Sequence, residues 1–151
     1  MIQSATRMAA IIALSLIGAP AFADGHLAAS GDAEAGERAF RQCQSCHVVQ
    51  DAEGEILAGR RAKTGPNLFG VVGRTAGTLD GFRYSGLVEA AGEAGMVFDE
   101  ATFVAYVQDP TAKSREVSGE GGRSKMSFKV RKEEDALNLY AFLAQFGDDM
   151  N

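Results

Sequence analysis

The run Cys43–His47, which reads Cys-Gln-Ser-Cys-His, constrains this chain more than any other stretch of its sequence. In a helical turn, positions i and i+3 lie on the same face, so both thiols can reach one flat ligand. A Cys-x-x-Cys-His run is typical of covalent haem attachment, in which the two thiols become thioethers to a single porphyrin. The next residue, His47, is then placed to bind the haem iron through a neutral imidazole nitrogen. We therefore expect one covalently attached haem c, with Cys43 and Cys46 as its anchors.

Two other uses of paired cysteines compete with haem attachment. The pair could be a redox dithiol, but a dithiol does not need a histidine as its next residue. It could also be half of a zinc site, but structural zinc needs about four ligands, and the chain has only two cysteines and two histidines. The second histidine, His26, lies outside the expected core. Haem attachment is the interpretation that uses the whole run.

The N-terminal 23 residues have the pattern of a secretory signal peptide. Arg7 is the only charge there, the apolar run 8–17 follows, and Ala21-Phe22-Ala23 resembles a signal peptidase site. A retained membrane anchor is the alternative, but the apolar stretch is shorter than the about 20 residues that a span requires. We expect residues 1–23 to be cleaved near Ala23, and residues 24–151 to be one soluble, monomeric periplasmic domain.

The expected domain reads as helical, with no convincing strand and no internal repeat. Asp32 suits the cap of a helix over 33–40 that leads toward Cys43, and Asp99 suits the cap of a helix over 100–109 that Pro110 ends. A last helix over 133–146 is indicated by its apolar residues at helical spacing, which are Leu139, Phe142, Leu143 and Phe146. The sequence thus predicts an all-α fold with three main helices.

Two long stretches between these helices lack periodicity. Residues 48–95 are rich in glycine and read mostly as loop, with a short helical piece near 87–91, and residues 110–126 read as a polar segment. Long irregular stretches are uncommon in a compact domain unless something else organises them. We expect the loops to wrap the haem, with apolar side chains such as Leu68, Phe69, Val71 and Val72 against its faces.

The second axial position on iron could be filled by water, by histidine or by methionine. His26 lies too close to the expected cleavage site, which makes bis-histidine ligation a poor fit. Of the methionines in the expected domain, Met150 is near the chain end and Met96 suits a gap-filling core residue. Met126 lies in the sequence Ser-Lys-Met-Ser-Phe, with neither helical spacing nor apolar neighbours to bury it. We therefore expect His47 and Met126 to be the axial ligands.

Charge is distributed unevenly along the chain, whose formal net charge is −5. Residues 110–132 contain seven basic and two acidic side chains, whereas residues 133–151 contain five acidic and no basic ones. Such a dipole orients encounters with an acidic partner, although each charge by itself could simply be a solvated surface residue. An acidic protein is a poor candidate for binding nucleic acid, which calls for a broad basic surface.

The chain resembles the class I cytochromes c, and among them the larger bacterial type to which cytochromes c2 and c-550 belong. The resemblance covers about residues 31–146. It is carried by Cys43–His47, by Thr64-Gly-Pro-Asn-Leu-Phe-Gly70, by Gly73-Arg74-Thr75 and by Lys125-Met126-x-Phe128. It implies the class I cytochrome c fold, in which Gly36 and Phe40 of the first helix pack against Leu139 and Phe142 of the last.

The resemblance also implies roles for residues around the haem. The Pro66 carbonyl would accept a hydrogen bond from His47 Nδ1, Arg74 and Tyr84 would bind a haem propionate, and Tyr106 would donate to the methionine sulfur. Ser124 stands where the family has a threonine near the other propionate. Phe98 is a departure, because it takes the place of a family tryptophan that bonds a propionate.

The function that follows from the resemblance is electron transfer without enzymatic activity. The implied donor is a cytochrome bc complex, and the acceptor is a photosynthetic reaction centre or a terminal cytochrome c oxidase, each contacted briefly at the membrane surface. Docking would use the basic side chains around the exposed haem edge, which are Arg123, Lys125, Lys129 and Lys132. The alternatives are a haem enzyme or gas-binding protein with an open sixth position, and a tethered electron-donating module with its N-terminal segment uncleaved.

Overall fold

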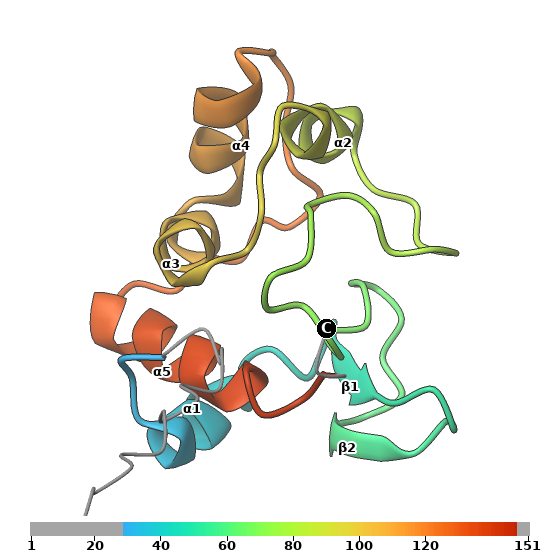
Figure 1. The fold of residues 1–151 in the computed structure, drawn as a ribbon, viewed down its shortest axis with the longest axis vertical. Coiled ribbons are helices and arrows are strands. Elements are labelled where there is room, and N and C mark those ends of the chain that lie inside the picture. Colours follow the sequence, from blue (N-terminus) through green and yellow to red (C-terminus); the bar gives the residue numbers. More distant parts are fainter. Residues whose placement is uncertain (1–28, 148–151) are drawn as a thin grey trace, which may run out of the picture.

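The computed structural model describes residues 29–147, which contain five helices (Figure 1). The helices are α1 (Ala33–Phe40), α2 (Gly86–Glu93), α3 (Glu100–Gln108), α4 (Pro110–Ser118) and α5 (Glu133–Leu143). Two short antiparallel strands, β1 (Val48–Gln50) and β2 (Ile56–Gly59), follow α1. The expected signal peptide, His26 and Met150 lie outside the described residues. None of the helices within 29–147 is long and apolar enough to cross a membrane.

Helices α1 and α5 cross in close contact, as the sequence predicts. Gly36 stands at the crossing, where a Cβ would lie only 1.9 Å from the carbonyl oxygen of Asn138. The rings of Phe40 and Phe142 pack beside it, with their centroids 5.4 Å apart. Asp32 caps α1 with its carboxylate and donates its backbone N–H to Asn138 Oδ1 at 2.7 Å. The glycine therefore allows the first and last helices to approach at backbone distance.

Helices α2, α3 and α4 lie above the α1–α5 pair in Figure 1, and α3 packs against α5 through Phe103 and Tyr140, whose ring centroids are 5.5 Å apart. A small apolar cluster of Ala76, Val88, Ala91 and Met96 packs between α2 and its neighbours. Met96 is 2% exposed, which confirms its interpretation as a core methionine. Asp99 caps α3 by accepting a hydrogen bond from Thr102 N, as predicted.

Helix α4 lies where the sequence predicts an irregular polar segment, and that prediction is wrong over residues 110–118. Pro110 ends α3, as predicted, but it is also the first residue of α4. Asp109 caps the new helix by accepting from Ala112 N, and Gly119 ends it in the left-handed region at φ 72°. Only Pro110 and Ser114 are buried, so α4 has no apolar stripe that periodicity could detect.

The hairpin formed by β1 and β2 is a second correction, because no strand is predicted. The strands have three and four residues, and their register shifts between Val49 and Gln50. A strand this short and irregular leaves no alternation of apolar and polar residues in the sequence. The last helix also ends earlier than predicted, at Leu143 instead of Phe146.

The loop over residues 60–85 joins the two helical groups through backbone hydrogen bonds. Its Gly65 N–H donates to Cys46 O at 2.7 Å, and its Gly70 N–H donates to Phe146 O at 2.9 Å. Farther along, its Gly73 N–H donates to Phe98 O at 2.9 Å. The loop thus forms a wall that runs from the α1–α5 pair to the α2–α4 group.

Candidate haem site

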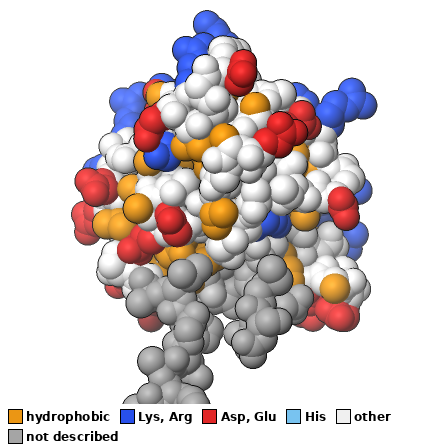
Figure 2. All heavy atoms as spheres, turned by 45° about the horizontal axis from the view of Figure 1, so that its top comes forward, with side chains coloured by type: hydrophobic (Ala, Val, Ile, Leu, Met, Phe, Trp, Pro, Cys, Tyr) orange, Lys and Arg blue, Asp and Glu red, His pale blue; other side chains and the backbone are white. Residues whose placement is uncertain are grey.

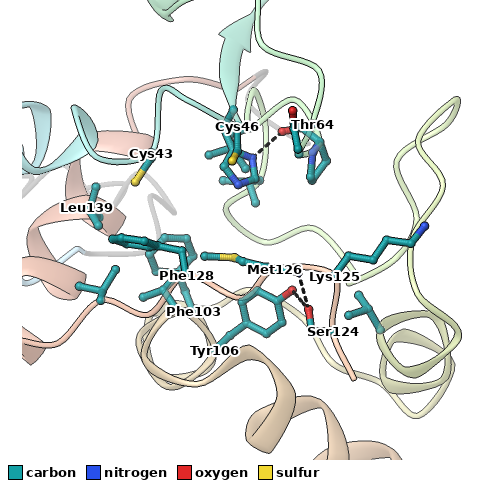
Figure 3. Close-up of a pocket in the computed structure, with 18 of the residues that line it drawn as sticks. Cys43, Cys46, Thr64, Phe103, Tyr106, Ser124, Lys125, Met126, Phe128 and Leu139 are labelled. Atoms are coloured by element: carbon teal, nitrogen blue, oxygen red, sulfur yellow. Dashed lines mark hydrogen bonds between the residues drawn. The ribbon is translucent and has the colours of Figure 1, made fainter. Parts of the chain in front are cut away.

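A cavity of about 340 Å³ is lined by residues of α1, α2, α3 and α5, of the loop over 60–85 and of the segment 124–130 (Figure 3). Its walls are largely apolar and include Phe40, Leu68, Val71, Phe98, Phe103, Val107, Leu139 and Leu143. Cys43, Cys46, His47 and Met126 all line this same space, although Met126 is far from the other three in the sequence. The structure therefore brings together the four residues expected to anchor and ligate a haem.

The two cysteines are presented by turns that continue from the end of α1. The N–H of Cys43 donates to Phe40 O at 2.8 Å, and the N–H groups of Cys46 and His47 both donate to Cys43 O. These bonds keep the helical sense of the chain, so both side chains face the cavity. Both thiols are free, and burial raises the pKa of Cys43 to about 11, so its thiol is protonated at neutral pH.

His47 is buried and held in one orientation. Its Nδ1 lies 2.8 Å from the carbonyl oxygen of Pro66, which can only accept, so Nδ1 carries the proton and Nε2 keeps its lone pair. This is the contact that the family resemblance implies. Burial lowers the pKa of His47, which favours the neutral imidazole that binds metals. A Cβ on Gly65 would lie 2.4 Å from His47 Cε1, so the Gly65 backbone lies directly against the ring.

Met126 lies in the irregular segment 124–130, between α4 and α5. Its N–H donates to Ser124 Oγ at 3.2 Å, and the Tyr106 hydroxyl lies 3.5 Å from the same oxygen (Figure 3). Burial raises the pKa of Tyr106 despite the opposing effect of Ser124, so the phenol keeps its proton at neutral pH. Tyr106 can therefore act as a hydrogen-bond donor beside the Met126 side chain.

The other residues that the resemblance implies also reach the cavity wall. Pro66, Arg74, Tyr84 and Ser124 all line it. The Arg74 guanidinium donates to Phe69 O at 3.1 Å and to Asn67 O at 3.0 Å, which fixes the group in place. Because a guanidinium has about five N–H donors, several remain for an anionic ligand. Burial raises the pKa of Tyr84, although the nearby Arg74 opposes this.

Phe98 gives the wall a purely apolar surface at its position. Its ring packs edge-on against Phe103 and Tyr106, with centroid distances of 6.4 and 5.1 Å. A phenyl ring has no N–H to offer, so any anionic group at this point must find its donors elsewhere.

The expected docking residues differ in their surroundings. Lys125 lines the cavity mouth and donates from Nζ to Arg83 O at 2.6 Å, and Lys129 forms an ion pair with Asp109. Arg123 and Lys132 are exposed. On the face drawn in Figure 2, basic and acidic side chains are interspersed among hydrophobic ones. The face drawn in Figure 2 therefore shows no continuous basic patch.

Two residues at the site were missed at the sequence level. Thr111 Oγ1 accepts a hydrogen bond from Ser124 N, and Asp109 binds Lys129, so both support the Met126 segment from the start of α4. The Asp-Pro pair at residues 109 and 110 is a recognisable helix start. Recognising α4 would have placed Thr111 in its first turn, but no sequence signal links that turn to Ser124.

Comparison with known proteins identifies the family. Cytochrome c2 of Rhodovulum adriaticum is 57% identical over 119 residues, which cover 78% of this chain and 94% of that protein. The solved structure of cytochrome c2 from Rhodobacter sphaeroides matches with a TM-score of 0.75 and 53% sequence identity. The match covers 78% of this chain and 97% of the chain in that structure. The chain belongs to the class I cytochromes c. Cytochrome c-550 of Paracoccus versutus, a more distant relative, is 42% identical over 127 residues, or 82% of this chain and 80% of that protein. No family model matches the chain.

Class I cytochromes c of this type are electron carriers, and their cofactor is one covalently bound haem c. The residues of the cavity fit that cofactor. Two free thiols, an imidazole with its Nε2 lone pair available and a thioether face one apolar space, and Gly65 leaves room for the ring of His47. Among residues 29–147 no three His, Cys, Asp or Glu side chains come together as a metal site.

Proposed function

We propose that this cytochrome c is a soluble periplasmic one-electron carrier whose haem iron is bound by His47 and Met126. The observation that carries the proposal is the convergence of both cysteines and both axial candidates on one apolar cavity. The haem, when bound, supplies reversible one-electron oxidation and reduction of its iron. The protein supplies attachment, orientation and a surrounding of low polarity.

The two proposed axial ligands have complementary properties. His47 is neutral and oriented, because Pro66 O accepts its Nδ1 proton at 2.8 Å, and this bond makes Nε2 a stronger donor to metal. Met126 offers a soft, uncharged thioether, which favours Fe(II) over Fe(III) and raises the reduction potential. With both positions filled, oxygen and peroxide find no vacant site, which distinguishes a carrier from a haem enzyme or gas-binding protein.

The polar residues of the wall are proposed to hold the anionic edge of the haem. Arg74 is fixed by its bonds to Phe69 O and Asn67 O, so its remaining donors are already oriented. Tyr84 and Ser124 offer hydroxyl groups at the same cavity, and Tyr106 offers its own beside Met126. Pre-oriented donors need little rearrangement when charge changes, and this favours fast electron transfer.

Docking is proposed to occur where the Met126 segment reaches the surface. Arg123, Lys125, Lys129 and Lys132 supply positive charge there, and Phe128, which lines the cavity, is 43% exposed and offers an apolar contact. The proposed donor is a cytochrome bc complex, and the proposed acceptor is a reaction centre or a cytochrome c oxidase. Small interfaces guided by charge form and dissociate quickly and weaken with salt. The proposed location in the periplasm rests on cleavage of residues 1–23.

Three measurements on the purified protein test the proposal. The mass under denaturing conditions should equal residues 24–151 plus one haem. Carbon monoxide added to the reduced protein near neutral pH should bind slowly or not at all, because Met126 occupies the iron. Electron transfer to an acidic partner should slow as salt is added. Prompt carbon monoxide binding would instead favour the haem enzyme, and a rate indifferent to salt would reject the basic residues as the docking surface.

A further inference from the structure

The Met126 segment, residues 124–130, is fastened to one place on the protein, the α3–α4 junction (residues 107–111). Three contacts join them, and they lie on both sides of Met126. The junction residues that make two of these contacts, Thr111 and Asp109, do not line the cavity. Their side chains therefore influence the cavity indirectly, and the segment that they hold is the part of its lining that they bond to.

The first contact lies before Met126. Ser124 donates its N–H to Thr111 Oγ1 at 3.2 Å, and Ser124 Oγ in turn accepts from Met126 N at 3.2 Å. The Tyr106 hydroxyl reaches the same Ser124 oxygen at 3.5 Å. Thr111 thus fixes the residue whose hydroxyl is bonded to the backbone of Met126.

The second and third contacts lie after Met126. Lys129 Nζ lies 2.5 Å from Asp109 Oδ2, and Val130 N donates to Val107 O at 2.9 Å. Asp109 uses its other oxygen, Oδ1, to accept from Ala112 N and cap α4. One carboxylate therefore binds the start of α4 and the far end of the segment at the same time.

We propose that Asp109 and Thr111 are positioning residues that hold the Met126 sulfur at the haem iron. This inference rests on the proposed function, in which Met126 is an axial ligand. The segment between the contacts has no helix or strand of its own, so its shape depends on where its ends are fixed. Losing either side-chain contact makes it easier for the segment to swing away, and an external ligand can then occupy the vacated position.

The test measures imidazole binding to the ferric holoprotein, followed by the loss of the sulfur-to-iron absorption band. Thr111→Val removes the acceptor for Ser124 N with little change in shape. Thr111→Ser is the matched variant that keeps a hydroxyl at this position. Asp109→Asn keeps an acceptor for the α4 cap but removes the charge that binds Lys129. We expect Thr111→Val and Asp109→Asn each to raise imidazole affinity about three- to ten-fold, and Thr111→Ser to bring it back toward the wild-type value.

Two control variants lie on α4 but do not touch the segment. Glu116→Gln breaks the Lys113–Glu116 ion pair, and Ser118→Ala removes a hydroxyl that donates to Ser114 O. Both should leave imidazole affinity unchanged, even if they lower the unfolding temperature slightly. A double-mutant cycle with Lys129→Met adds a further check, because Asp109→Asn should have no additional effect once Lys129 is gone.

The outcomes separate this inference from the function on which it rests. A wild type that binds imidazole as tightly as Met126→Ala would overturn both, since Met126 would not be the ligand. A wild type that resists imidazole, together with Thr111→Val and Asp109→Asn variants that resist it equally, would overturn the positioning role alone. A rise of equal size in the two controls would also overturn it, because the effect would then come from general loss of α4 stability.

Discussion

His47 and Met126 line one cavity, but different kinds of contact hold them there. On the His47 side, the bonds run to backbone carbonyls: His47 Nδ1 to Pro66 O, and Gly65 N to Cys46 O. On the Met126 side, the acceptor of Met126 N is the Ser124 side chain, and the segment is tied by the side chains of Thr111 and Asp109. Backbone contacts survive most substitutions, whereas side-chain contacts are lost with a single one. The Met126 side is therefore the one that sequence change can loosen.

The largest expected effect comes from removing Met126, the proposed ligand on the looser side. Met126→Ala should lower the reduction potential by roughly 0.1 V or more, because axial ligands set haem potentials over a range of about 0.8 V. Covalent attachment of haem should persist, since Cys43, Cys46 and His47 are held independently. Potentiometric titration measures the change, with Met96→Leu as the control for a buried methionine. If Met96→Leu lowered the potential and Met126→Ala did not, Met96 would be the iron ligand and Met126 would not.

On the His47 side, a substitution that crowds the histidine ring should lower the unfolding free energy more than the loss of a single side-chain hydrogen bond does. Gly65→Ala would bring a Cβ to 2.4 Å from His47 Cε1, so the ring or the loop must move. We expect the holoprotein to lose about 1–3 kcal/mol of unfolding free energy. Gly86→Ala is the matched control, because a Cβ there would meet nothing within 4 Å. Denaturant unfolding compares the two variants, and equal stabilities would show that the Gly65 contact is not restrictive.

The buried Tyr140 and the half-buried Tyr106 extend the comparison to hydroxyl groups. Tyr140 in α5 is fully buried, and within residues 29–147 its hydroxyl has no hydrogen-bond partner. Tyr140→Phe should therefore leave stability unchanged or raise it by up to about 1 kcal/mol. Tyr106→Phe should lower it by about 0.5 kcal/mol, because the hydroxyl faces Ser124 Oγ. Thermal unfolding of both variants shows whether each substitution raises or lowers the stability. A loss of stability in Tyr140→Phe would contradict the prediction for Tyr140.

The smallest expected effect is the response of the Asp109 contact to acid. Lys129, the charged group that faces Asp109, lowers the pKa of this carboxylate, and the N–H of Ala112 lowers it further. The stabilisation is present above the unfolded-state pKa of about 3.9 and is lost as the pH falls through the lower folded-state pKa. Acid titration of the sulfur-to-iron band should thus show a transition below about pH 4 that shifts in Asp109→Asn. An identical transition in the variant would assign it to other groups.

The sequence was most informative at positions where a local structural or chemical role strongly favours one residue type. Some residues have a local role that can be recognised from their type alone. They are the Cys43–His47 run, the helix-capping residues Asp32 and Asp99, and Gly36 at the crossing of α1 and α5. The caps and the crossing glycine are confirmed by individual contacts, and the predicted fold class is confirmed by the solved relatives. The haem-binding roles of Cys43, Cys46 and His47 remain proposals.

The sequence was least informative where polar residues meet across long distances. Helix α4 buries only Pro110 and Ser114, so its start and stop signals had no apolar pattern to support them. The pairing of Thr111 with Ser124, and that of Asp109 with Lys129, depend on how α4 packs, and residue type alone does not specify either. The supports of Met126 were therefore beyond sequence reasoning, although the sequence does propose Met126 as a ligand.

The contact between Gly36 and Asn138 also has a consequence for the order of assembly. The two residues lie near opposite ends of the described chain, and the bond from Asp32 to Asn138 spans 106 positions. Closing so long a loop costs conformational entropy, which the packing of Gly36 and Phe40 against Asn138 and Phe142 offsets only when α5 is present. Until α5 has been synthesised, α1 lacks the helix that it packs against, and the cavity beside the thiols lacks the wall formed by Leu139 and Leu143. The sulfur atoms stay accessible during that interval, which is the natural window for haem to be joined to them.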